Sequence, residues 1–122
     1  MKLFEECLCN FLQGVKMTEN VDYLDKKSIR KNNKGVDLYR KNAKYIADFY
    51  PNKISDFLTL LSNDNEKVKI CCAICATEFM QINKEQKEFI KNIVVEHFNK
   101  SDAAEQMMWR VWIEEHMQSG ND

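Results

Sequence analysis

The fold is decided by residues 54–80, which read ISDFLTLLSNDNEKVKICCAICATEFM. Apolar residues recur at helical spacing in its first part: Ile54, Phe57, Leu58 and Leu61. This spacing predicts a short helix over residues 52–62. A polar turn follows, in which Asp64 can cap a second helix over residues 65–80. The buried face expected for this second helix is built mainly from small residues: Val68, Cys71, Cys72, Cys75, Ala76 and Phe79. The stretch therefore predicts two helices in close contact.

Two further helices are expected on the N-terminal side. The first covers residues 2–13, and Gly14 is expected to end it. Residues 15–27 allow either a short helical turn capped by Thr18 or a loop. A long helix should then cover residues 28–49, weakened at Gly35 by up to about 1 kcal/mol relative to alanine and ended by Pro51. Its apolar stripe consists of Ile29, Val36, Tyr39, Ala43, Ile46 and Phe49 or Tyr50.

Two helices are also expected on the C-terminal side. Asn83 followed by Gln86 resembles a capping box, which would open a helix over residues 84–99. Its apolar face comprises Phe89, Ile90, Ile93, Val94 and Phe98. Ser101 or Asp102 can cap a last helix over residues 102–117. That helix is expected to be buried through Ala104, Met107, Met108, Val111 and Trp112.

The composition agrees with a helical domain. The 122 residues are 44% hydrophobic and 30% charged, which suits one core with a well-solvated surface. Three glycines and one proline are too few for the turns of a sandwich or barrel. We expect a single all-α domain of five to six helices stacked in pairs. It comprises an N-terminal helix and connection (1–27), a repeat core (28–117) and a frayed tail (118–122).

The central stretch resembles a HEAT repeat. Leu60-Leu61 ends its first helix, Asp64 lies in the turn, and Val68-Lys69 leads into a run of small residues. Over residues 28–115 the pattern also includes Asn33 and Val36-Asp37 before the repeat. After the repeat it includes a helix with an alanine-to-tryptophan spacing, either Ala103 to Trp109 or Ala104 to Trp112. The wider pattern is similar to a bacterial family of small HEAT-like proteins, domain of unknown function 2019, except that cysteines stand here where alanines are usual. The resemblance implies HEAT-like stacked helix pairs, an α-solenoid fragment without an established activity. Small helical-repeat proteins of this sort occur as immunity proteins beside polymorphic toxins, which implies a cognate toxin as partner.

Five cysteines raise the question of a metal site: Cys7, Cys9, Cys71, Cys72 and Cys75. Cys72 and Cys75 have zinc-ligand spacing, and Cys7 and Cys9 could add two thiolates. Their place among apolar residues of a predicted helix favours buried core thiols, so we expect no metal or other cofactor. The odd number of cysteines and the lack of a recognisable export signal indicate reduced thiols and a cytoplasmic protein.

Neither catalysis nor a membrane span is expected. His97 and His116 belong to no recognisable nucleophile motif, and no glycine-rich phosphate loop occurs. Glu114 and Glu115 are adjacent, so on a helix their side chains point about 100° apart and do not converge on one atom. No apolar run approaches the roughly 18 residues that a bilayer crossing needs.

Charge divides the chain into two candidate surfaces. Residues 26–44 carry eight cations against Asp37 alone, a net charge of +7 in a chain of net charge −1. The cations are Lys26, Lys27, Arg30, Lys31, Lys34, Arg40, Lys41 and Lys44. This helix could contact the phosphates of a nucleic acid or simply be a solvated face. Tyr39 and Lys44 mark it as a second possible protein-binding surface.

Residues 102–122 form the opposite, acidic surface, with five acids: Asp102, Glu105, Glu114, Glu115 and Asp122. Trp112 is assigned to the core and Trp109 to a partly exposed position. Because interfaces combine aromatic anchors with a charged rim, we expect a protein partner to bind Glu105, Trp109, Glu114 and Glu115. The leading hypothesis is a non-catalytic immunity protein that neutralises a cognate toxin of a contact-dependent growth inhibition or other polymorphic toxin system. The alternative is a nucleic-acid-binding helical repeat that uses the basic helix.

Overall fold

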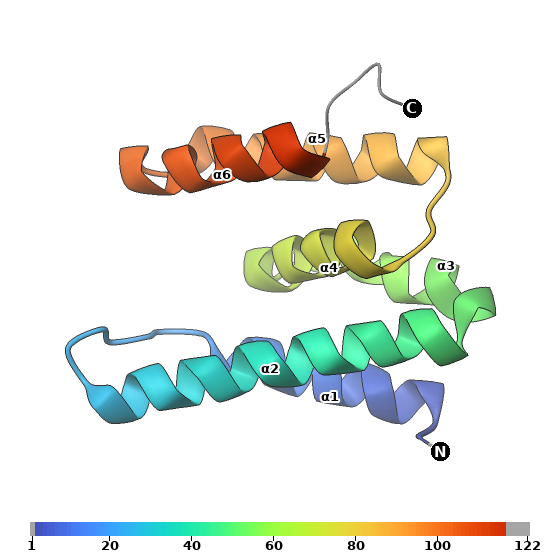
Figure 1. Ribbon diagram of the computed structural model, residues 1–122, viewed down its shortest axis with the longest axis horizontal. Helices are drawn as coiled ribbons and strands as arrows, with labels where there is room; N and C mark the ends of the chain where they lie inside the picture. The colour runs from blue at the N-terminus through green and yellow to red at the C-terminus, as the bar shows by residue number, and fades with distance from the viewer. Residues whose placement is uncertain (1, 117–122) are drawn as a thin grey trace.

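The computed structural model describes residues 2–116, which fold into six α-helices and contain no strand (Figure 1). The helices are α1 (Phe4–Met17), α2 (Lys26–Phe49), α3 (Ile54–Phe57), α4 (Glu66–Phe79), α5 (Lys84–Lys100) and α6 (Ala103–His116). Two short 3-10 segments, η1 (Pro51–Lys53) and η2 (Leu58–Ser62), flank α3. The predicted all-α fold of five to six helices is confirmed. The tail expected at residues 118–122 lies outside the described part of the chain.

The helices stack in three layers (Figure 1). The first layer pairs α1 with α2, the second pairs α3 and η2 with α4, and the third pairs α5 with α6. Helix α4 lies in the middle and contacts α2 on one side and α5 on the other. The pair predicted from residues 54–80 is therefore the central layer, and its first helix is divided into an α-helical turn and a 3-10 segment.

Two glycines set the distance between α1 and α2. A Cβ atom on Gly14 would lie 2.7 Å from the backbone oxygen of Gly35, and one on Gly35 would lie 2.6 Å from the backbone oxygen of Gly14. The prediction that Gly14 ends the first helix is therefore wrong, because α1 continues to Met17 and Gly14 is buried within it. Thr18 follows α1 as its C-cap, and its hydroxyl donates to the Val15 carbonyl at 2.7 Å.

The helix starts follow local capping chemistry. Residues 19–25 form a turn-containing loop, and Asp25 caps α2 by accepting from the Lys27 amide at 3.1 Å. Asn65, not the predicted Asp64, caps α4, since its side chain accepts from the amides of residues 67 and 68. The capping box of Asn83 and Gln86 is confirmed. Asp102 caps α6 by accepting from the Glu105 amide at 2.9 Å.

The core runs continuously through the three layers. Phe11 of α1 meets Phe57 of α3 edge to face, with ring centroids 5.0 Å apart, and Ile90 and Val94 of α5 close the other side. The predicted small-residue face of α4 is confirmed by its buried members: Val68, Cys71, Cys72, Cys75 and Ala76. Of the two alternatives at the end of the α2 stripe, Tyr50 packs against the core and Phe49 is 52% exposed. Phe89, predicted to be buried from its spacing, is 50% exposed instead.

Candidate functional site

The inner face of α6 attaches this helix to the rest of the molecule. Trp109, Trp112 and Ile113 pack against the core but stay partly exposed, and no residue of α6 is fully buried. Trp109 meets the imidazole ring of His97 edge to face, with centroids 5.5 Å apart. The Gln106 side chain donates to the Phe98 carbonyl of α5 at 3.1 Å. Helix α6 is thus held mainly by α5, through half-buried aromatic contacts.

The outer face of α6 is apolar and exposed. Met107, Met108 and Val111 are 70%, 74% and 55% exposed, and Ala104 is exposed beside them. Their prediction as buried residues is therefore wrong. Because the four positions are spaced i, i+3, i+4 and i+7, they form one stripe along the helix. We call Ala104, Met107, Met108 and Val111 the α6 outer stripe.

Three predicted contact residues border this stripe, and the fourth does not. Glu105, Glu114 and Glu115 are exposed, whereas Trp109 lies on the inner face. Around the helix axis, Glu114 lies about 180° from Glu105, so the two carboxylates stand on opposite sides of the outer stripe. Residues 102–116 contain four carboxylates and one guanidinium, a net charge of −3 with His116 neutral. The predicted patch is therefore an apolar stripe within an acidic border, while Trp109 is partly exposed, as expected, but lies on the inner face.

One signal in the sequence could have revealed this surface. The last helix has apolar residues on every side, more than a single buried face can accommodate. The spacing alone fits either Trp109 with Trp112 and Ile113, or the methionines with Val111, as the inner face. The larger aromatic side chains face inward in the structure.

A cluster of charged side chains connects α4 to α5 next to the inner face of α6. Glu66, in the first turn of α4, accepts from Lys100 Nζ at 3.0 Å, and its other α5 partner is His97 Nδ1 at 3.1 Å. Hydrogen bonds from Lys100 and His97 hold the pKa of the Glu66 carboxyl below its usual range. His97 thus contacts Glu66 of the second layer and Trp109 of the third, and it helps to position α6.

Tyr39 and Lys44, which mark the second predicted surface, do not lie on one face of α2. Tyr39 is half-buried, packs edge to face on Phe11 with centroids 5.7 Å apart, and has a phenol whose pKa is raised by burial. Lys44 is exposed and pairs with Asp48 at 3.2 Å. The two side chains point about 140° apart around α2.

The basic helix keeps most of its charge unpaired. Arg40 forms an ion pair with Glu78 of α4 at 3.0 Å. Within residues 2–116, six other cations of α2 have no ion pair: Lys26, Lys27, Arg30, Lys31, Lys34 and Lys41. Most of them lie on the side of α2 that faces away from the buried Gly35 and Ala43. This side is a second charged surface, opposite in sign to α6.

The thiols of α4 lie in the apolar interior. Cys72 and Cys75 are fully buried, and burial raises the pKa of both, which opposes the thiolate form that binds metals. Cys7 is buried in α1 and Cys9 is exposed on the same helix. No group of three potential metal-binding side chains occurs in the part of the chain that the structure describes.

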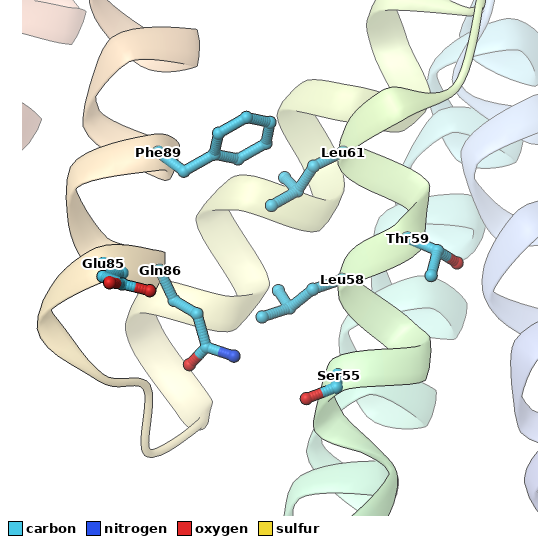
Figure 2. Close-up of a pocket in the computed structure, with 7 residues that line it drawn as sticks. All are labelled: Ser55, Leu58, Thr59, Leu61, Glu85, Gln86 and Phe89. Atoms are coloured by element: carbon cyan, nitrogen blue, oxygen red, sulfur yellow. The ribbon is translucent and has the colours of Figure 1, made fainter.

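A shallow open groove of about 390 Å³ separates the central layer from α5 (Figure 2). In Figure 2 the Phe89 ring points toward Leu61, and Gln86 projects into the gap from the same helix as Phe89. The Gln86 side-chain oxygen already accepts from the Asn83 amide at 2.9 Å. The groove therefore offers an apolar wall and few free polar groups, in contrast to the bordered stripe on α6.

Comparisons with models of protein families, with curated proteins and with solved structures find no match for the chain. No helix among residues 2–116 is both long and apolar enough to cross a bilayer.

Proposed function

We propose that this chain is a non-catalytic protein-binding module whose contact surface is the α6 outer stripe. The observation that carries this proposal is the exposure of Met107, Met108 and Val111 on one face between carboxylates. Contiguous apolar patches with a polar rim mark interaction sites on protein surfaces. Methionine side chains are flexible and polarizable, which suits a surface that must adapt to a partner.

The partner proposed here is a protein toxin, which the chain neutralises as an immunity protein. Two considerations support this finer assignment. The sequence resembles small HEAT-like proteins of the kind found beside toxins, and the acidic border of α6 would speed association with a basic protein. Neutralisation would be steric, because the stripe would cover part of the toxin that its target needs.

Affinity capture from the native cell tests this proposal, with the native chain and the variant Met107→Asp/Met108→Asp as paired baits. The native chain should retain one basic protein that the variant loses, since a charge in a desolvated contact opposes binding. Co-production of the native chain should then restore growth to cells that make the captured protein. Equal capture by both baits would refute the surface, and a captured protein that is harmless to cells would refute the immunity role.

A second candidate function follows from the basic side of α2. Six cations without ion pairs on one helix could neutralise phosphates of a nucleic acid. Binding to a synthetic duplex or single strand should then weaken steeply as salt rises, and Lys26→Glu/Arg30→Glu should reduce it further. A flat salt response, or no binding at low salt, would remove this candidate.

A further inference from the structure

The first and last helices of the stack, α1 and α6, have exposed faces of different composition. The exposed side of α1 is formed chiefly by the polar residues Glu5, Glu6, Gln13 and Lys16, together with Cys9. The exposed side of α6 carries the apolar outer stripe. Stacked-helix proteins need a polar outer face on their terminal units, because each unit otherwise buries its apolar face against a neighbour. One end of this stack is therefore closed, and the other has a surface suited to a further helix.

We propose that the α6 outer stripe binds a basic amphipathic helix of a partner protein, which lies along α6 as an additional layer of the stack. This inference rests on the proposed protein-binding function and specifies the partner's chemistry. From Ala104 to Val111 the stripe covers about 10 Å of helix length, or two turns. An apolar ridge with this spacing packs against the apolar face of another helix.

An extended segment would find no backbone partners on this surface. The backbone amides and carbonyls of α6 are used within the helix, apart from those at its ends. Strand addition requires an open sheet edge, and residues 2–116 contain no strand. A helix needs no backbone partners, since its own groups are satisfied internally.

The border of the stripe specifies the charge of the occupant. Residues 102–116 carry a net charge of −3, with Glu114 and Glu115 at one end and Asp102 and Glu105 at the other. A second copy of the chain docked through the same stripe would oppose these carboxylates to each other, and an anionic lipid surface would meet the same repulsion. Lysines or arginines that flank an apolar face would instead meet complementary charge, which gives orientation and faster association.

A direct test uses the full chain and a synthetic amphipathic peptide of leucine and lysine, with leucines at i, i+3, i+4 and i+7. A peptide of the same composition in scrambled order is the first control. Titration calorimetry should give binding to the patterned peptide that is about tenfold or more tighter than to the scrambled one. The variant Met107→Asp/Met108→Asp should lose about tenfold or more in affinity.

A matched variant separates the surface from a general effect of added charge. Tyr23→Asp/Leu24→Asp places two carboxylates at exposed apolar positions in the loop before α2, and it should bind the patterned peptide like the native chain. Both double variants change only exposed side chains, so their circular dichroism and melting temperatures should match the native values.

The outcomes distinguish this inference from the function on which it rests. Equal binding of the patterned and scrambled peptides, while native-cell capture still depends on the methionines, would overturn the basic-helix chemistry alone. Capture that does not depend on the methionines would overturn the contact surface as well. Concentration-dependent dimerisation abolished by Met107→Asp/Met108→Asp would show that a second copy is the occupant, and would also overturn the inference.

Discussion

The first layer and the last helix bury their apolar residues to very different extents. In α1, Phe11 and Val15 are completely buried, and the α1 and α2 backbones meet at Gly14 and Gly35. In α6 no residue is fully buried, although this helix contains a larger share of apolar residues than α5, which it contacts. The apolar residues of these two regions therefore differ in their surroundings. In the first layer they stabilise the fold, and on the outside of α6 they are exposed and form the surface that we propose binds a partner.

Truncation of one apolar side chain in each region should give the largest contrast. Phe11→Ala removes a fully buried ring and should lower the free energy of unfolding by about 3–5 kcal/mol, through lost burial and a cavity. Met108→Ala should change it by no more than about 0.5 kcal/mol, because that side chain is already 74% exposed. Urea denaturation followed by circular dichroism measures both. A loss above about 2 kcal/mol for Met108→Ala would mean that the stripe belongs to the core.

A methyl group at the glycine contact should have the next largest effect. Gly35→Ala places a Cβ 2.6 Å from the Gly14 oxygen and 2.8 Å from Met17 Cβ, so the helices must separate. We expect a loss of about 2 kcal/mol in unfolding free energy, despite the better helix propensity of alanine.

The control for this contact is Asn33→Ala on the exposed side of α2. It should stabilise the chain slightly, by up to about 0.5 kcal/mol, because alanine is the better helix former and nothing opposes its side chain. If Gly35→Ala also stabilised the protein, the close approach of α1 and α2 would be refuted.

The weaker attachment of α6 should be visible with two spectroscopic probes. Both tryptophans of the chain, Trp109 and Trp112, lie in α6, whereas circular dichroism reports on all helices. Elements with few buried contacts open at lower free energy than the core. We therefore expect tryptophan emission to change at lower urea concentration than the circular dichroism signal. Coincident transitions would indicate that α6 unfolds only with the whole domain.

Glu66, which links the central layer to α5, should make a small contribution to stability that depends on pH. Its pKa is lowered in the folded state, so its carboxylate stabilises the fold above the usual glutamate pKa of about 4.3, and this contribution is lost as the pH falls below that value. Glu66→Gln should thus be less stable than the native chain at neutral pH, and this difference should disappear in acid.

The Glu66 effect should stay below about 1 kcal/mol, because the side chain is 41% exposed and its ion pairs are screened. Thermal melts at several pH values provide the measurement. Glu88→Gln, at an exposed position of α5 beyond its first turn, is the control, and at neutral pH it should change the free energy of unfolding by no more than about 0.5 kcal/mol. A difference between native and Glu66→Gln proteins that grew as the pH fell would have the wrong sign for this account.

Local sequence patterns predict the helices well where capping and burial agree. The capping box at Asn83 and the small-residue face of α4 are both found in the structure. A glycine at position 14 predicts a helix end, because glycine often ends helices, but the role of Gly14 depends on its contact with Gly35 in another helix. Such a contact cannot be read from either helix alone. Asn65 replaces Asp64 as the cap by a shift of one residue, since both side chains can accept from the first amides.

The candidate site was predicted only in part, for a geometrical reason. The carboxylates of α6 are exposed as expected, because charged groups stay in water. The sequence does not decide which apolar residues of this helix face inward, because spacing allows two registers. The choice of Trp109 and Trp112 for the inner face depends on tertiary contacts with α5, such as that with His97. Because the tryptophans face inward, the methionines on the opposite side of α6 are exposed.

We propose that the outside of α6 contacts a partner protein. Site-specific photocrosslinking in the native cell tests it most directly, with a benzoylphenylalanine placed at Met108 and, in a matched variant, at Gln13 on the exposed side of α1. The account predicts a covalent adduct with one protein from position 108 and none from position 13. An adduct from position 13 and none from position 108 would contradict it.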